Sequence, residues 1–285
     1  ALLLSACSIP TATAAPTTSL GPLRPSLPSP TLRPPTQAPT ATATPAGDAC
    51  LQRRGRMVVR ELVDPDLPRS IPFRIYLPPC FVEHPSWRYP TLYLFHGATG
   101  TDSQWDEMGA DETAEELIAA GEAPPFLIVM PWERLGLDWQ DAILNHLVPY
   151  VETVYRASPD RGLRAFGGLS RGAGWAFRIG FGHPRATGAV GMHSPAILPP
   201  DLYLVPIWVQ DLPPQELPRL WIDIGDHDSL RPSTLELTAL LDSLQVRYTW
   251  NLFPGDHLWE YWESHLGEYL RWYAEGWPLA LQAGR

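Results

Sequence analysis

The sequence predicts an α/β fold: a mostly parallel sheet of about eight strands, helices on both of its faces, and an antiparallel hairpin at the N-terminal end. Two observations lead to this prediction. After residue 90, short apolar runs alternate with stretches of helical periodicity, a pattern typical of a parallel sheet covered on both faces. Before it, two strand-like runs at 56–63 and 72–77 flank a turn-rich sequence of proline and aspartate, which indicates a hairpin.

The remaining elements follow in order along the chain. Each expected strand is a short apolar run bounded by turn residues, and each expected helix is longer and amphipathic. Strands are expected at 91–95, 126–130, 163–166, 187–192, 219–224 and 246–253. Helices are expected at 111–120, 140–155, 171–181, 232–245 and 258–273. The proline-rich segment 194–218 is predicted to form an irregular wall over the site, with an inert surface loop as the alternative.

The first 48 residues are not expected to belong to this fold. Residues 1–7 resemble the end of a truncated signal peptide with a lipobox, in which Cys7 becomes the lipidated residue. Residues 8–48 hold ten prolines and nine threonines and are predicted to be a disordered tether. We therefore expect an exported protein, anchored by lipid at the outer face of a bacterial cell membrane, with one folded domain at 49–285.

Charge and cysteine content narrow the possible chemistry. A net charge of −10 argues against nucleic acid as a partner. All 21 basic residues are arginine, which excludes Schiff-base chemistry and a serine–lysine dyad. Cys50 and Cys80 are expected to meet at the open end of the hairpin and to form a disulfide, although two separate reduced thiols are the alternative. The sequence leaves the oligomeric state open.

The motif Gly-x-Ser-x-Gly at 168–172 is the strongest sign of chemistry in the chain. It follows an apolar run and opens a helical stretch, so Ser170 is expected on a tight strand-to-helix turn with its hydroxyl exposed. Glycines are needed at both ends of the motif, because a side chain there would crowd the turn. Ser170 is therefore the predicted nucleophile.

A serine nucleophile needs a base and an orienting acid, which follow it in this order of chain elements: acid, then histidine. His257 comes directly after the last expected strand and is the predicted general base. Asp228 follows the strand before it and is the predicted acid, with Asp226 as the alternative. The cluster of Asp223, Asp226, His227 and Asp228 could also suggest a metal site, but such loop clusters usually cap or face solvent, so no metal or other cofactor is expected.

Two backbone amides should form an oxyanion hole, where they would stabilise the negative charge of the transition state. One is the amide of Arg171, directly after the nucleophile. The other is expected from Ala98, in the turn at 96–100, where His96 is expected to have a structural or hole-shaping role. Substrate-pocket candidates are Trp105, Trp132, Trp175 and His193, with Trp139 and Trp208 as further aromatic candidates.

Together these features resemble the putative-esterase family of α/β-hydrolases, which includes feruloyl esterases and is similar to esterase D. The resemblance runs from about residue 56 to 273 and rests on the motifs at 74–79, 89–97, 167–172, 224–228 and 253–257. It implies an α/β-hydrolase fold and a serine carboxylic-ester hydrolase acting on a small-molecule, carbohydrate or lipid ester. It also implies Ser170, Asp228 and His257 as the triad and Ala98 and Arg171 as the hole. The alternatives are a mycolyltransferase-like acyl transfer with the same triad, and a non-catalytic binding module of this fold.

Overall fold

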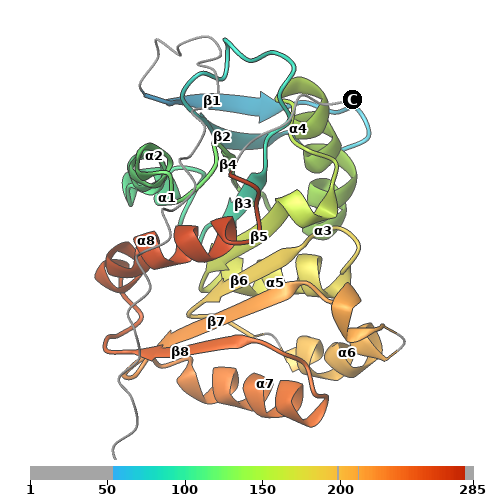
Figure 1. The fold of residues 1–285 in the computed structure, drawn as a ribbon. Helices are drawn as coiled ribbons and strands as arrows, with labels where there is room; N and C mark the ends of the chain where they lie inside the picture. The colour runs from blue at the N-terminus through green and yellow to red at the C-terminus, as the bar shows by residue number, and fades with distance from the viewer. Residues whose placement is uncertain (1–53, 198, 211, 280–285) are drawn as a thin grey trace, which may run out of the picture. The chain divides into compact units, whose positions relative to one another are not determined.

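A sheet of eight strands runs through the described part of this computed structural model, which comprises residues 54–197, 199–210 and 212–279 (Figure 1). The strand order is β1-β2-β4-β3-β5-β6-β7-β8. β2 pairs antiparallel with both β1 and β4, and every other neighbouring pair is parallel. The strands are β1 (Arg56–Leu62), β2 (Ile71–Leu77), β3 (Thr91–Phe95), β4 (Leu127–Pro131), β5 (Arg164–Leu169), β6 (Ala189–His193), β7 (Arg219–Gly225) and β8 (Thr249–Phe253).

Helices cover both faces of this sheet. One face carries α1 (Gln104–Glu107), α2 (Ala110–Ala120) and α8 (Trp259–Ala274). The other carries α3 (Trp139–Asp141), α4 (Val148–Val154), α5 (Arg171–Gly182), α6 (Pro199–Val209) and α7 (Arg231–Ser243). A π-helical segment, Ala142–Leu147, joins α3 to α4, and 3-10 turns lie at Arg161–Leu163 and Pro214–Glu216.

The two hydrophobic layers follow from the two-residue period of a strand. In β3, Tyr93 and Phe95 pack into the layer that contains α5, whereas Leu92 and Leu94 pack into the layer that contains α8. All five residues of β3 are buried, as are those of β4 and β6. Burial on both sides explains why these strands are continuous apolar runs in the sequence. It confirms the predicted α/β-hydrolase architecture with its N-terminal hairpin.

The predicted irregular wall at 194–218 is wrong over much of its length, because 199–209 form the helix α6. The segment was expected to be irregular because of its prolines. Pro199 and Pro200 lie in the first helical turn, where a backbone amide has no helical partner to lose. The expected helix at 140–155 exists, but its first half is a short α-helix followed by the π-helical segment.

Several predictions concern residues outside the described part of the chain. These are the lipidation of Cys7, the tether at 8–48 and the start of the folded domain at residue 49; they stay predictions. The same holds for the pairing of Cys50 with Cys80, since Cys50 lies outside the described residues. Among the described helices, none has both the length and the apolar character needed to cross a bilayer.

Candidate active site

Ser170 lies on the sharp turn between β5 and α5, near the carboxyl ends of the parallel strands. Its backbone has φ 53° and ψ −119°, a conformation that residues other than glycine rarely adopt. The turn is tight: a Cβ on Gly168 would lie 2.4 Å from the carbonyl carbon of Gly172, and a Cβ on Gly172 would lie 2.2 Å from the Phe95 oxygen. The Ser170 amide donates to the carbonyl of His193 over 2.9 Å, which fixes the turn on β6.

A histidine and a carboxylate align behind the Ser170 hydroxyl. His257 Nε2 lies 2.9 Å from Ser170 Oγ, and His257 Nδ1 lies 2.7 Å from Asp228 Oδ2. The Asp228 side chain is fully buried, and its other oxygen accepts the Leu230 amide over 2.7 Å. Burial opposes ionisation, but the hydrogen bonds from His257 and Leu230 outweigh it and lower the pKa of Asp228 below its usual value. Asp228 therefore stays a carboxylate and sets His257 with Nδ1 protonated and Nε2 free to accept the serine proton.

Asp226, the alternative acid, has a different position. Its Oδ1 accepts the Gly255 amide over 2.9 Å and the His227 ring over 2.7 Å, so it braces the turn before His257 and does not contact the imidazole of His257. The Gly255 hydrogen bond is the main reason that the pKa of Asp226 is lowered. In the described residues, no group of three histidine, cysteine or carboxylate side chains is arranged to hold a metal ion.

The turn after β3 lies directly beside the nucleophile. A Cβ on Gly97 would be 3.7 Å from the Ser170 Cβ. The Gly97 amide is already used, since it donates to Gln104 Oε1 over 2.8 Å. Ala98 is exposed, and within the described residues its amide donates no hydrogen bond to the protein. Arg171 is the first residue of α5, where a helical amide has no carbonyl partner in its own helix. Ala98 and Arg171 remain the predicted hole donors.

A chain of contacts through His96, Glu133 and Arg171 joins the turn after β3 to the start of α5. His96 Nδ1 donates to the Gly97 carbonyl over 2.7 Å, and His96 Nε2 accepts the Glu133 amide over 2.9 Å. Glu133 also pairs with the Arg171 guanidinium at 2.7 Å. Burial lowers the pKa of His96, which favours the neutral ring that this bridge requires. Sequence reasoning gave His96 a structural role but missed Glu133 and Gln104, because neither follows a recognisable spacing.

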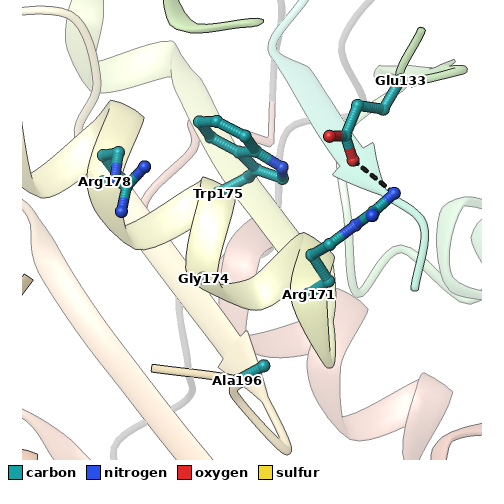
Figure 2. A pocket seen from close by; sticks show the side chains of 6 residues that line it. All are labelled: Glu133, Arg171, Gly174, Trp175, Arg178 and Ala196. Atoms are coloured by element: carbon teal, nitrogen blue, oxygen red, sulfur yellow. Dashed lines mark ion pairs between the residues drawn. The ribbon is translucent and has the colours of Figure 1, made fainter. Parts of the chain in front are cut away.

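A pocket of about 60 Å³ opens beside Arg171 on the α5 side of the site (Figure 2). Trp175 forms part of its wall, and the two arginines on α5 flank the indole. Arg178 stacks 5.2 Å from the Trp175 ring centroid and binds the buried Asp201 of α6 through two nitrogens, at 2.7 and 2.9 Å. Both arginines are thus paired with carboxylates, so the pocket carries polar donors but little net charge. Its lining residues are Glu133, Arg171, Gly174, Trp175, Arg178 and Ala196.

Two of the predicted pocket residues are wrong. Trp105 is 1% exposed and packs in the core, with its indole N–H donating to the Phe95 carbonyl over 3.0 Å. His193 is completely buried and hydrogen-bonds Asp223, so it lies beneath the site and not in its wall. Trp132 is half-buried under Arg134 and does not line the pocket of Figure 2.

The two further tryptophan candidates also belong to the packing of the fold. Trp139 is buried against Phe95, and Trp208 packs against Phe177. Of the six predicted pocket residues, only Trp175 lines the pocket beside Arg171. A residue can line a pocket only if its side chain is accessible to solvent, and the sequence alone does not show which tryptophans and histidines are buried.

This chain is similar to known proteins over most of its length. The sequence model of a protein family described as putative esterase matches residues 65–273. The structure of a ferulic acid esterase is 26% identical, with a TM-score of 0.71, and the alignment covers 79% of this chain and all of the other. A feruloyl esterase module from Clostridium thermocellum, complexed with sinapinate, shares the fold at 17% identity and a TM-score of 0.67, over 77% of this chain and 88% of that one.

Curated relatives match shorter stretches. An endo-1,4-beta-xylanase/feruloyl esterase of Xylanibacter ruminicola is 27% identical over 155 residues, which is 50% of this chain and 20% of that protein. An uncharacterized protein of Corynebacterium glutamicum is 26% identical over 241 residues, which is 70% of this chain and 56% of that protein. The chain therefore spans only part of the length of these relatives.

Proposed function

Because the chain belongs to the putative esterase family, we propose that it hydrolyses a carboxylic ester through a covalent acyl-enzyme on Ser170. The observation that carries the proposal is the continuous hydrogen-bonded line from Asp228 through His257 to Ser170 Oγ. A serine hydroxyl is a weak nucleophile at neutral pH, and this line supplies the base and the orienting acid that activate it.

The proposed reaction has two halves. His257 Nε2 takes the Ser170 proton as Oγ attacks the ester carbonyl, and the carbonyl π electrons move onto the oxygen, which the Ala98 and Arg171 amides stabilise. The oxyanion collapses, the ester C–O bond breaks, and the imidazolium gives its proton to the leaving alcohol. A water molecule, deprotonated by His257, then attacks the acyl carbonyl carbon; the acyl C–Oγ bond breaks, and the imidazolium returns its proton to Ser170 Oγ, which releases the acid. Asp228 stabilises the imidazolium in both halves.

The pocket beside Arg171 is the proposed acyl site. Its indole wall and its paired arginines favour a flat, partly polar acyl group such as a hydroxycinnamoyl group. Its volume of about 60 Å³ is well below the range for small-molecule sites, so only part of such an acyl group would enter it. Several similar structures are named as ferulic or feruloyl esterases, which supports the same substrate class.

The test compares wild type with Ser170→Ala and His257→Ala on p-nitrophenyl acetate and methyl ferulate. Each substitution should lower kcat by about 10⁴-fold or more, since either one disables the activated nucleophile. Ser243→Ala, at an exposed position on α7, is the matched control and should keep wild-type turnover. Equal turnover by wild type and Ser170→Ala would refute the proposal. Acyl transfer is distinguished by adding an alcohol acceptor and looking for an ester product.

We also propose that the protein is exported and anchored through a lipid on Cys7. The support is the lipobox and the proline- and threonine-rich stretch at 8–48. Full-length protein should partition into the detergent phase of a Triton X-114 extraction, whereas Cys7→Ser should partition into the aqueous phase. Equal partitioning of the two would contradict the anchor.

A further inference from the structure

A buried carboxylate outside the triad is the starting point. Asp223, on β7, has no solvent exposure, and both of its oxygens are occupied. Oδ1 accepts from His193 Nδ1 at 2.6 Å and from the Trp221 indole at 2.7 Å. Oδ2 accepts from the Tyr261 and Tyr269 hydroxyls at 2.8 and 2.9 Å. Four donors match the lone pairs of an ionised carboxylate, so this buried charge is fully satisfied.

Asp223 is held in a fixed position relative to Ser170 by the strand ladder. In the sheet register, Leu169 of β5 lies opposite His193 of β6, and His193 lies opposite Asp223 of β7. The Ser170 amide donates to the His193 carbonyl over 2.9 Å, and the Ser194 amide donates to the Asp223 carbonyl over 2.9 Å. Backbone hydrogen bonds across these strands therefore fix the position of Asp223 relative to Ser170.

Tyr261 connects Asp223 to the turn that bears His257. It lies in the first turn of α8, four residues after His257. Its ring packs directly on the turn before His257, since a Cβ on Gly255 would lie 2.8 Å from the ring. Gly255 has φ 143° and carries no side chain, so the ring of Tyr261 packs directly on its backbone. The next residue, Trp262, meets the His257 ring edge-on at 4.9 Å.

The hydroxyl of Tyr261 acts as a donor in this contact. Burial and the nearby charge of Asp223 raise the pKa of Tyr261 well above its usual value. The tyrosine thus stays protonated and keeps its bond to Asp223. Burying a carboxylate costs free energy that an apolar cluster would not cost, so stability alone does not explain this arrangement.

We propose that Tyr261 is a positioning residue, which holds the turn bearing His257 against Ser170 through its hydrogen bond to Asp223. The inference rests on the proposed function of Ser170 and His257. Catalysis by these groups depends on near-contact geometry, and small displacements cost large factors in rate. Tyr261 touches neither substrate nor reacting atoms; it acts through the position of the imidazole.

The chain offers a closely matched control, Tyr269. Its hydroxyl donates to the same oxygen of Asp223 as that of Tyr261, and it too is buried, but it lies two helical turns further along α8, away from the turn of His257. Tyr93 gives the baseline: it is buried, and its hydroxyl has no hydrogen-bond partner among the described residues. Three Tyr→Phe substitutions therefore separate the loss of a hydroxyl, the loss of this hydrogen bond, and the loss of the tie to His257.

The experiment measures kcat and KM with p-nitrophenyl acetate as substrate. It also measures the melting temperature of each variant and the rate at which a fluorophosphonate labels Ser170. Tyr261→Phe should lower kcat and the labelling rate by about tenfold, with KM within about twofold of wild type. Tyr269→Phe should lower the melting temperature equally but keep kcat within about twofold. Tyr93→Phe should match wild type in every measurement.

Equal kcat in the folded Tyr261→Phe and Tyr269→Phe proteins would overturn the inference, because a purely structural network predicts no difference between them. Asp223→Asn is the second variant, and it should reproduce the loss of kcat without a change in KM; unchanged kcat there would also overturn it. Failure of the proposed function looks different: wild type and Tyr93→Phe would themselves be inactive and unlabelled.

Discussion

The two sides of Ser170 are built in different ways. On the His257 side, two aspartate side chains fix the loop after β8 by hydrogen bonds. Asp228 holds the imidazole of His257, and Asp226 holds the Gly255 amide. On the α6 side, the pocket is lined by two arginines paired with carboxylates, of which Arg178 pairs with Asp201 of α6, and the outer surface of α6 exposes apolar side chains such as Tyr203 and Ile207.

The difference follows from what each side has to do. Proton transfer between Ser170 and His257 requires their atoms within hydrogen-bond distance, so that side needs many fixed polar contacts. A pocket wall only has to present a shape and a few polar groups to part of a substrate. Substitutions on the His257 side should therefore act on kcat, and those on the α6 side should act on KM or stability.

Asp228→Asn gives the largest expected effect. The amide keeps the shape of the side chain but no longer stabilises the histidine tautomer or the imidazolium, so kcat should fall by about 10⁴-fold with little change in KM. Asp226→Asn is the matched control, because Asp226 braces the turn without touching the imidazole, and its kcat should fall by less than about tenfold. Similar losses in the two variants would break the distinction drawn between these carboxylates.

Arg178→Ala tests the α6 side and should have an intermediate effect. It leaves the Asp201 carboxylate, whose side chain is 1% exposed, buried without its cation. Removing one partner of such a pair costs about 3–5 kcal/mol, visible in urea unfolding, and KM for methyl ferulate should rise. Arg185→Ala is the control, because its pair with Glu216 is 4.0 Å long and the arginine is largely exposed. Equal stability of the two variants would contradict this account of the wall.

Ile207→Ser on the outer surface of α6 should have the smallest effect. The side chain is 64% exposed, so its loss should change the free energy of unfolding by less than about 0.5 kcal/mol. Turnover of p-nitrophenyl acetate should equal that of wild type. A tenfold fall in kcat would show that the α6 side contributes to the chemistry and would remove the contrast between the two sides.

The sequence predicted the sheet and the position of the candidate triad for the same reason. Both depend on local patterns: apolar runs that end in turns, and polar residues placed directly after them. Ser170 follows β5, Asp228 follows β7 and His257 follows β8, and parallel strands bring their carboxyl ends to one edge. The choice between Asp226 and Asp228 needed the structure, because residues two apart on a loop can each turn toward the histidine.

Features that depend on packing were not predictable in this way. Trp105 and His193 were expected in the pocket, but Trp105 is buried against the end of β3 and His193 is covered by Tyr269 and Tyr273 of α8, and burial is not visible in a motif. Helix α6 was missed because its almost uniformly apolar sequence shows no helical periodicity and carries Pro206 in its interior. The contact of Tyr261 with Asp223 joins residues 38 positions apart and leaves no local trace.

The bridge from His96 through Glu133 to Arg171 has a consequence for the energetics of turnover. It links the turn after β3, which carries Ala98, to the first residue of α5, and these are the two places from which the proposed hole donors come. In the proposed reaction, amides held in place by the folded chain would leave little reorganisation energy to add to the barrier of each catalytic cycle. Water around a free ester has to reorient every time charge builds on the carbonyl oxygen, whereas amides fixed by the fold do not.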